Sequence, residues 1–180
     1  MDHNKKILRG GIKLERIIQK GIQGMIPVYG DNGENGIYIY THGGEEIYID
    51  KSIRSFISYL FHQRRIDLYA LRQWTSSILH RRNGLPLVLS RELVWVPIKI
   101  RKPIGRADGS EGYISLLHIK DLAEKDHKTS IQLKCGKEIS SLHSKKIIES
   151  RILFAQLMLA KYEKEQMEWE RSHKAQDFSY

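Results

Sequence analysis

The chain has 180 residues, of which 41% are hydrophobic and 28% are charged, a composition typical of one folded domain rather than of a disordered segment. Its longest uncharged apolar run, Leu93–Ile98, is far shorter than the roughly 18–20 residues that span a bilayer. Cys135 is the one cysteine, which excludes an intramolecular disulfide and a thiolate metal cluster. Because no apolar leader segment precedes Arg16, we expect a cytoplasmic protein.

The net charge of +9 is unevenly distributed along the chain. Residues 51–106 hold twelve Lys and Arg, nine of them Arg, against only two acids, Asp67 and Glu92, which gives this stretch a charge of +10. The other eighteen bases and nineteen acids nearly cancel, at −1. Such one-sided, arginine-rich charge favours a polyanionic partner over a merely solvated face.

Residues 1–21 predict a weakly structured segment with a short helix around Lys13–Gln19, where Gly10 and Gly11 weaken the helical pattern. From Ile22 onward the pattern changes to β structure, with β-branched and aromatic residues between turns at 31–36 and 42–44. A three-stranded meander is predicted, with strands at Met25–Tyr29, Ile37–Thr41 and Glu46–Ile49.

Two helices are predicted next. The first carries apolar residues at spacings of three and four, namely Ile53, Phe56, Ile57, Leu60 and Phe61. Asp50 or Ser52 is placed to cap its N-terminus. The second helix spans about Ile66–Arg82, and Gly84 and Pro86 end it.

The remainder of the chain predicts more strands and a closing helix. The strands are expected at Pro86–Ser90, Leu93–Ile98, Gly112–His118, Thr129–Cys135 and Lys137–Leu142. A basic loop, Lys99–Glu111, joins the second of these strands to the third. The helix runs from Ser144 to about Arg171, and its apolar stripe is broader than one core-facing side requires, which favours self-association.

The predicted fold class is therefore α+β, with antiparallel strands and hairpins flanking a central helix pair and a long C-terminal helix. We expect a single domain over residues 22–160 and a charged helical extension with a tail over 161–180. The chain carries no Gly-rich phosphate loop, no His-Glu metal motif and no nucleophile elbow, and its eight histidines lie at no metal-ligand spacing. We accordingly expect no enzymatic activity, no metal and no cofactor.

Two elements are candidates for nucleic-acid binding. One is the helix pair with its basic ends, which as a helix-turn-helix would read the major groove but more plausibly packs in the core. The other is the loop Lys99–Glu111, a shape suited to the narrow minor groove of A/T-rich DNA, in which Ile104 is either an apolar wedge or packs against its own loop. The predicted DNA-binding residues are Arg64, Arg65, Arg72, Arg81, Arg82, Lys99, Arg101, Lys102 and Arg106. We expect the basic helix ends to contact the DNA backbone as anchors, and we expect the loop to read the sequence or the shape of the groove.

Several short motifs follow one another in a characteristic order. They include Val28–Gly33, Ile47–Ser52, Ile78–Arg81, Pro86–Val88, Leu93–Pro97, Gly112–Ser115 and His118–Asp121. From roughly Ile22 to Leu159, their order and spacing resemble the ComK family, the competence transcription factors of Gram-positive bacteria. The tail Met167–Tyr180 departs from the family's aromatic, proline-containing C-terminus, and the basic loop lacks the cysteine associated with that part of the family.

The resemblance implies an activator that binds paired A/T-rich promoter boxes through the minor groove. It also implies dimers, or dimers of dimers, that assemble on one promoter in the nucleoid, act with RNA polymerase and switch on DNA-uptake genes. The main rival hypothesis is a binding module for RNA or single strands, with Trp95, Tyr113 or other exposed aromatic residues as stacking platforms. Two further hypotheses are an enzyme that acts on nucleic acid and an interaction protein without a nucleic-acid role.

Overall fold

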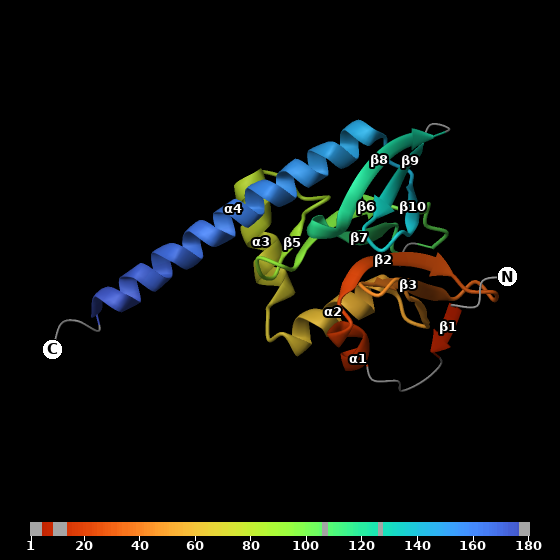
Figure 1. The fold of residues 1–180 in the computed structure, drawn as a ribbon, viewed down its shortest axis with the longest axis horizontal. Coiled ribbons are helices and arrows are strands. Elements are labelled where there is room, and N and C mark those ends of the chain that lie inside the picture. Colours follow the sequence, from red (N-terminus) through yellow and green to blue (C-terminus); the bar gives the residue numbers. More distant parts are fainter. Residues whose placement is uncertain (1–4, 9–13, 106–107, 126–127, 177–180) are drawn as a thin grey trace.

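The computed structural model describes residues 5–8, 14–105, 108–125 and 128–176, and it has the expected α+β architecture (Figure 1). A seven-stranded sheet forms its centre, and every neighbouring pair is antiparallel except the parallel pair at one edge, β1 with β4. In spatial order the strands are β1 (Lys5–Leu8), β4 (Glu46–Ile49), β3 (Asn35–Thr41), β2 (Ile22–Tyr29), β7 (Glu111–Ser115), β6 (Val94–Lys99) and β5 (Leu87–Val88).

A second, smaller antiparallel sheet and the helices surround this centre. The sheet has the order β10 (Glu138–Ser141), β9 (Lys128–Leu133) and β8 (Ile119–Lys125). The helices are α1 (Leu14–Gln19), α2 (Ile53–Gln63), α3 (Leu68–Leu79), the 3₁₀ turn η1 (Leu116–His118) and α4 (Lys145–Gln176).

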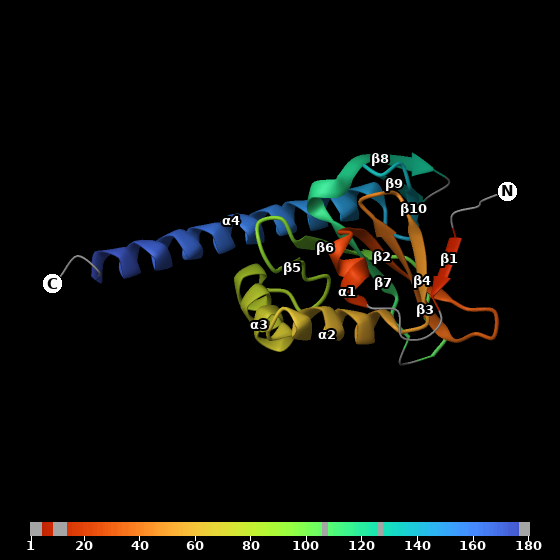
Figure 2. The same ribbon diagram turned by 60° about the horizontal axis from the view of Figure 1, so that its bottom comes forward.

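The pleat of the large sheet divides the core between its two faces, because successive side chains of a strand point to opposite sides. Met25 and Trp95 belong to the cluster under α1 and α2, whereas their neighbours Ile26 and Val96 belong to the cluster under α4 and the small sheet. Figure 2 shows α2 on one side of the sheet and α4 with β8–β10 on the other. The strands are therefore apolar on both faces.

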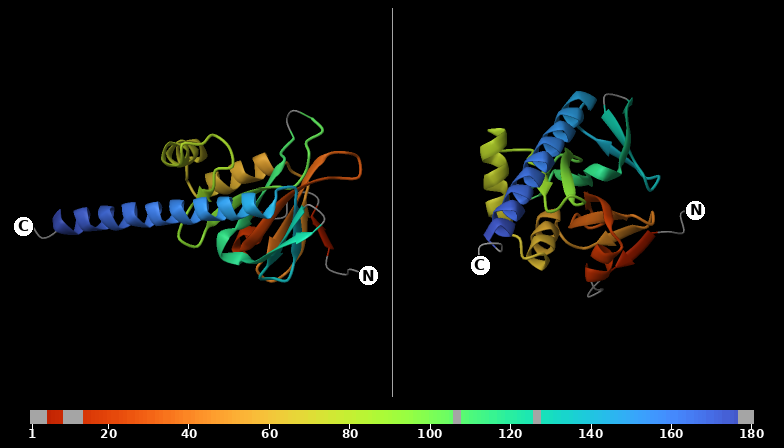
Figure 3. Two further views of the ribbon diagram at one scale, coloured as in Figure 1. Left: turned by 90° about the horizontal axis from the view of Figure 1, so that it is seen from above. Right: turned by 60° about the vertical axis from the view of Figure 1, so that its left-hand side comes forward.

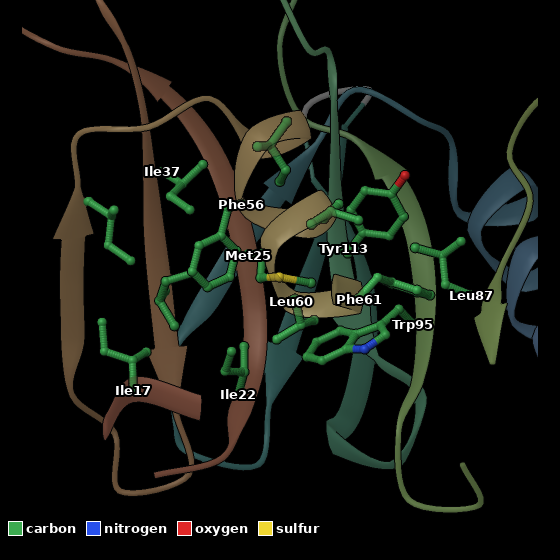
Figure 4. Close-up of a cluster of buried hydrophobic side chains, with 14 of the residues drawn as sticks. Ile17, Ile22, Met25, Ile37, Phe56, Leu60, Phe61, Leu87, Trp95 and Tyr113 are labelled. Atoms are coloured by element: carbon green, nitrogen blue, oxygen red, sulfur yellow. The ribbon is translucent and has the colours of Figure 1, made fainter. Parts of the chain in front are cut away.

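Helix α2 covers its face with the predicted apolar stripe, and Phe56 and Phe61 are buried among Met25, Leu87 and Trp95 (Figure 4). Of the two residues placed to cap this helix, Ser52 forms the cap, since its hydroxyl accepts a hydrogen bond from the Ser55 backbone N–H at 3.2 Å.

Helix α3 is shorter than the sequence predicts at both ends. Asp67 caps its N-terminus by accepting from the backbone N–H groups of Tyr69 and Ala70. At the other end His80 adopts a left-handed conformation with φ of 50°, so the helix stops at Leu79 instead of Arg82. Arg81 and Arg82 consequently leave the helix axis and lie on the turn that follows.

Strands β1 and β8 were not predicted, and the strand expected over Gly112–His118 is wrong at its end. The chain leaves β7 at Ser115 and turns through η1, which redirects it from the large sheet to the small one. Strand β8 has a charged sequence, IKDLAEK, whose pattern does not predict a strand. Its strand conformation is stabilised by antiparallel pairing with β9.

Helix α4 extends well past the rest of the molecule (Figure 1). Its middle is tied to the body by the Trp74 indole N–H, which donates to Glu165 at 3.2 Å, and by the ion pair of Arg91 with Glu163 at 3.5 Å. Met167 and Trp169, beyond these ties, are exposed. In the described part of the chain, no helix combines the length and the apolar character that crossing a membrane requires.

Candidate nucleic-acid interface

The loop between β6 and β7 projects beside the β2–β3 turn at one end of the large sheet (Figure 3, left). Its outermost described residues, Lys102, Pro103, Ile104 and Gly105, are all exposed. Ile104 is 83% exposed, the largest fraction of any large hydrophobic side chain in the described residues. The expectation that Ile104 packs against its own loop is therefore wrong.

Asp108 braces the base of this loop. Its carboxylate accepts hydrogen bonds from the Tyr29 hydroxyl at 2.6 Å and the Asn35 amide at 2.9 Å, and from the backbone N–H groups of Gly105 and Ile104 at 2.7 and 3.2 Å. The side-chain bonds from Asn35 and Tyr29, followed by those from the backbone, hold the pKa of Asp108 well below its usual range. The charged carboxylate thus fixes the loop to both strands of the β2–β3 hairpin beside its turn.

Arg101 points into this cluster instead of toward solvent. Its guanidinium carbon lies 3.8 Å from the centre of the Tyr29 ring, and its Nε donates to the Gly109 carbonyl at 2.8 Å. Its Nη2 donates to the Asn35 side-chain oxygen. Arg101 was predicted as a DNA contact, but its Nε and Nη2 donate within the protein and its Nη1 is buried without a hydrogen-bond partner, so we assign it the role of holding the loop.

Removing the Asp108 charge should change how stability depends on pH. Because the folded protein lowers the pKa of this carboxylate, the stabilisation is fully present above the unfolded pKa of about 3.9 and is lost as the pH falls below it. The Asp108→Asn variant should therefore lose less stability than the wild type between pH 7 and pH 3, as measured by the urea midpoint. Tyr29→Phe, which removes one donor and keeps the carboxylate, should give an intermediate profile, and parallel profiles for all three proteins would contradict the assignment.

Two hollows on the helical side of the molecule meet at Arg72. One, of about 440 Å³, is lined by Tyr69, Arg72, Gln73, Ser76, Arg82 and Leu85. The other, of about 240 Å³, is lined by Arg72 with Ile53, Arg54, Ile57, Tyr113 and residues 108–111. Because Arg72 lines both, the two hollows are neighbours, and their lining residues extend from the end of α3 to the base of the β6–β7 loop. We call Arg54, Arg72 and Arg82 the arginine strip.

The charge of the arginine strip is largely uncompensated. Among the described residues, no carboxylate lies within ion-pair distance of any of the three guanidinium groups. Glu111, which lines the second hollow together with Asp108, is paired with Arg151 at 2.8 Å. Burial raises the pKa of the Tyr113 hydroxyl, while the nearby charge of Arg72 opposes this shift. An anion that entered the strip would meet three guanidinium groups that form no ion pair, although the carboxylates of Asp108 and Glu111 also line the second hollow.

The other predicted residues lie elsewhere. Arg65 lines a separate hollow at the α2–α3 turn, and Arg64 lies beside the apolar lining near Trp95. The guanidinium of Arg81 stacks 4.7 Å from the centre of the Phe154 ring of α4. Lys99 is half-buried, and its backbone N–H donates to His143. Arg106 lies outside the described residues.

Of the predicted set, the structure brings together Arg72 and Arg82, and it adds Arg54, which was not predicted. Lys102 is exposed on the β6–β7 loop and lines neither hollow. Arg54 belongs to the basic stretch, but nothing in the sequence signals that α2 begins against the loop base. That contact is close, because a Cβ on Gly109 would lie 2.6 Å from the Ile53 side chain. The position of Arg54 beside the loop depends on this packing.

The aromatic side chains expected for a single-strand binding surface are buried. Trp95 is 1% exposed and Tyr113 is 7% exposed, so neither can stack a base. Tyr69, which is 72% exposed, lines the first hollow beside Arg72 and Arg82. The prediction of Trp95 and Tyr113 as stacking platforms was therefore wrong.

The chain matches no family model, no curated protein and no solved structure. Among the residues that the structure describes, no group of three or more His, Cys, Asp or Glu side chains could hold a metal ion. The projecting loop and the arginine strip are the features that bear on function.

Proposed function

We propose that this chain binds A/T-rich double-stranded DNA as a transcription regulator of the ComK type, without catalysis. In this proposal the β6–β7 loop enters the minor groove and the arginine strip contacts the adjacent phosphates. The observation that carries it is the braced loop, with Lys102 and Ile104 exposed at its tip, standing at the end of a surface lined by Arg54, Arg72 and Arg82.

The shape and charge of these features suit the minor groove. That groove is only about 6 Å wide, and in A/T-rich DNA it narrows and its negative potential increases. A thin loop with a basic residue at its tip can enter it, whereas a helix cannot. Phosphate contacts supply most of the affinity of such complexes, and exposed arginines with few acidic neighbours suit that role.

The proposal includes binding as a dimer and activation of DNA-uptake genes with RNA polymerase, as the resemblance to ComK implies. The exposed apolar side chains along α4, among them Leu153, Leu157 and Trp169, support self-association through this helix. These side chains give no information about which genes are regulated.

Competition binding tests the proposal. A labelled A/T-rich duplex bound to the full chain is displaced with unlabelled A/T duplex, G/C duplex, single strands and RNA. We expect the A/T duplex to compete at the lowest concentration and to be recovered uncleaved in the presence of Mg²⁺. Stronger competition by single strands or RNA would favour a single-strand or RNA binding module, and cleavage of the duplex would favour an enzyme.

A further inference from the structure

Ile104 has an exposed side chain on a backbone that hydrogen bonds hold in place. Its side chain is 83% exposed, yet its N–H donates both to the Tyr29 hydroxyl at 2.9 Å and to Asp108 at 3.2 Å. Asp108 also accepts from the next N–H, that of Gly105, at 2.7 Å. The tip is therefore held in one conformation while it offers an apolar side chain to solvent.

The residues around Ile104 keep the tip narrow. Pro103 on one side has a fixed φ and no N–H, and Gly105 on the other has no side chain. Lys102 is exposed one residue further back, where its ammonium group can reach a phosphate. Among the described residues of the loop, a single branched apolar side chain thus stands exposed, with a cation two residues before it.

We propose that Ile104 is a wedge that enters the duplex from the minor groove, partly unstacks one A/T base step and kinks the DNA. Proteins that insert apolar side chains in this way bend the duplex by about 20–90°. Steps of T followed by A are the most easily unstacked, so the wedge would also contribute to A/T preference without a base-edge hydrogen bond. This proposal rests on the proposed function.

The bracing cluster explains how such a wedge could act. Unstacking a base step costs free energy, and a flexible tip would also lose conformational entropy on insertion. The Asp108 hydrogen bonds and the Arg101–Tyr29 contact hold the tip before DNA arrives. The loop therefore has less order to gain on binding.

The test uses the full chain and an A/T-rich duplex of about 30 base pairs. One adenine of a central TA step is replaced by 2-aminopurine, whose fluorescence rises on unstacking, and dyes at the two ends report bending by energy transfer. We expect the wild type to raise the fluorescence and to shorten the end-to-end distance. Ile104→Ala should lose both signals while binding weakens by less than about tenfold, because phosphate contacts remain, and Ile104→Met should keep both.

Leu117→Ala is the matched control, because Leu117 is also exposed and aliphatic but lies on η1, away from the loop. It should behave as the wild type. Unstacking and bending that persist in Ile104→Ala, or a wild type that binds without either signal, would overturn the wedge alone. A wild type that does not bind the A/T duplex would overturn the proposed function and the wedge with it.

Discussion

Raising the salt concentration from about 50 to about 200 mM is expected to weaken binding of the chain to an A/T-rich duplex by about 10³–10⁵-fold. The expectation follows from the uneven charge, since residues 51–106 carry +10 and nine of the eleven bases that the structure describes there are exposed. A complex in which Lys and Arg neutralise about 6–10 phosphates releases a similar number of counterions, and added salt opposes that release. Titrations by fluorescence anisotropy at a series of salt concentrations measure the slope of the logarithm of the binding constant against the logarithm of the salt concentration.

A nearly flat dependence on salt would contradict an electrostatic interface. The slope should be the same for A/T and G/C duplexes, because the phosphates of the two are alike, while the affinities should differ. Equal affinities at every salt concentration would remove the selectivity that the proposed function requires.

Replacing Arg54, Arg72 and Arg82 together by Gln should reduce the magnitude of this slope by about 3, since each lost phosphate contact removes about one unit. If the two proteins bind equally well near about 1 M salt, a slope that is smaller by about 3 makes the variant's affinity roughly a thousandfold lower at about 0.1 M. The loss should be similar for all duplex sequences, because the arginine strip contacts phosphates rather than base edges in this account. Circular dichroism checks that the variant folds, which matters because Arg72 lies near the buried Tyr113 hydroxyl.

A charge-matched control is available on the small sheet and the turn that follows β9, where Lys120, Lys128 and Lys134 are all exposed. Replacing these three by Gln removes the same charge but not the strip, and it should leave the slope nearly unchanged. Equal effects of the two triple variants would mean that only the overall charge of the protein attracts DNA.

Much of the fold could be predicted from local patterns. The β2–β3–β4 meander, the two central helices and the long C-terminal helix follow from periodicity and turn residues, and each is present with shifted ends. Strand β1 could not be predicted, because this edge strand pairs in parallel with β4, which is far along the chain. The early end of α3 depends on the left-handed conformation of His80, which its residue type does not signal.

The candidate site could be predicted only as a region. Charge along the sequence pointed to the β6–β7 loop, but it could not tell Lys102, which is exposed, from Arg101, which is held by Tyr29 and Asn35. Both are basic residues of the same loop, and their roles differ because the β2–β3 hairpin lies beside it. The arginine strip was likewise invisible, since it forms only when α2 and α3 pack so that Arg54 and Arg72 line one hollow.

The central claim is that the chain reads A/T-rich DNA from the minor groove, and blocking one groove at a time tests it most directly. The full chain is titrated onto an A/T-rich duplex that has been saturated with distamycin, which fills the minor groove, or with methyl green, which occupies the major groove. We predict that distamycin prevents binding and that methyl green leaves it unchanged. Binding that survives distamycin and is lost with methyl green would contradict the account.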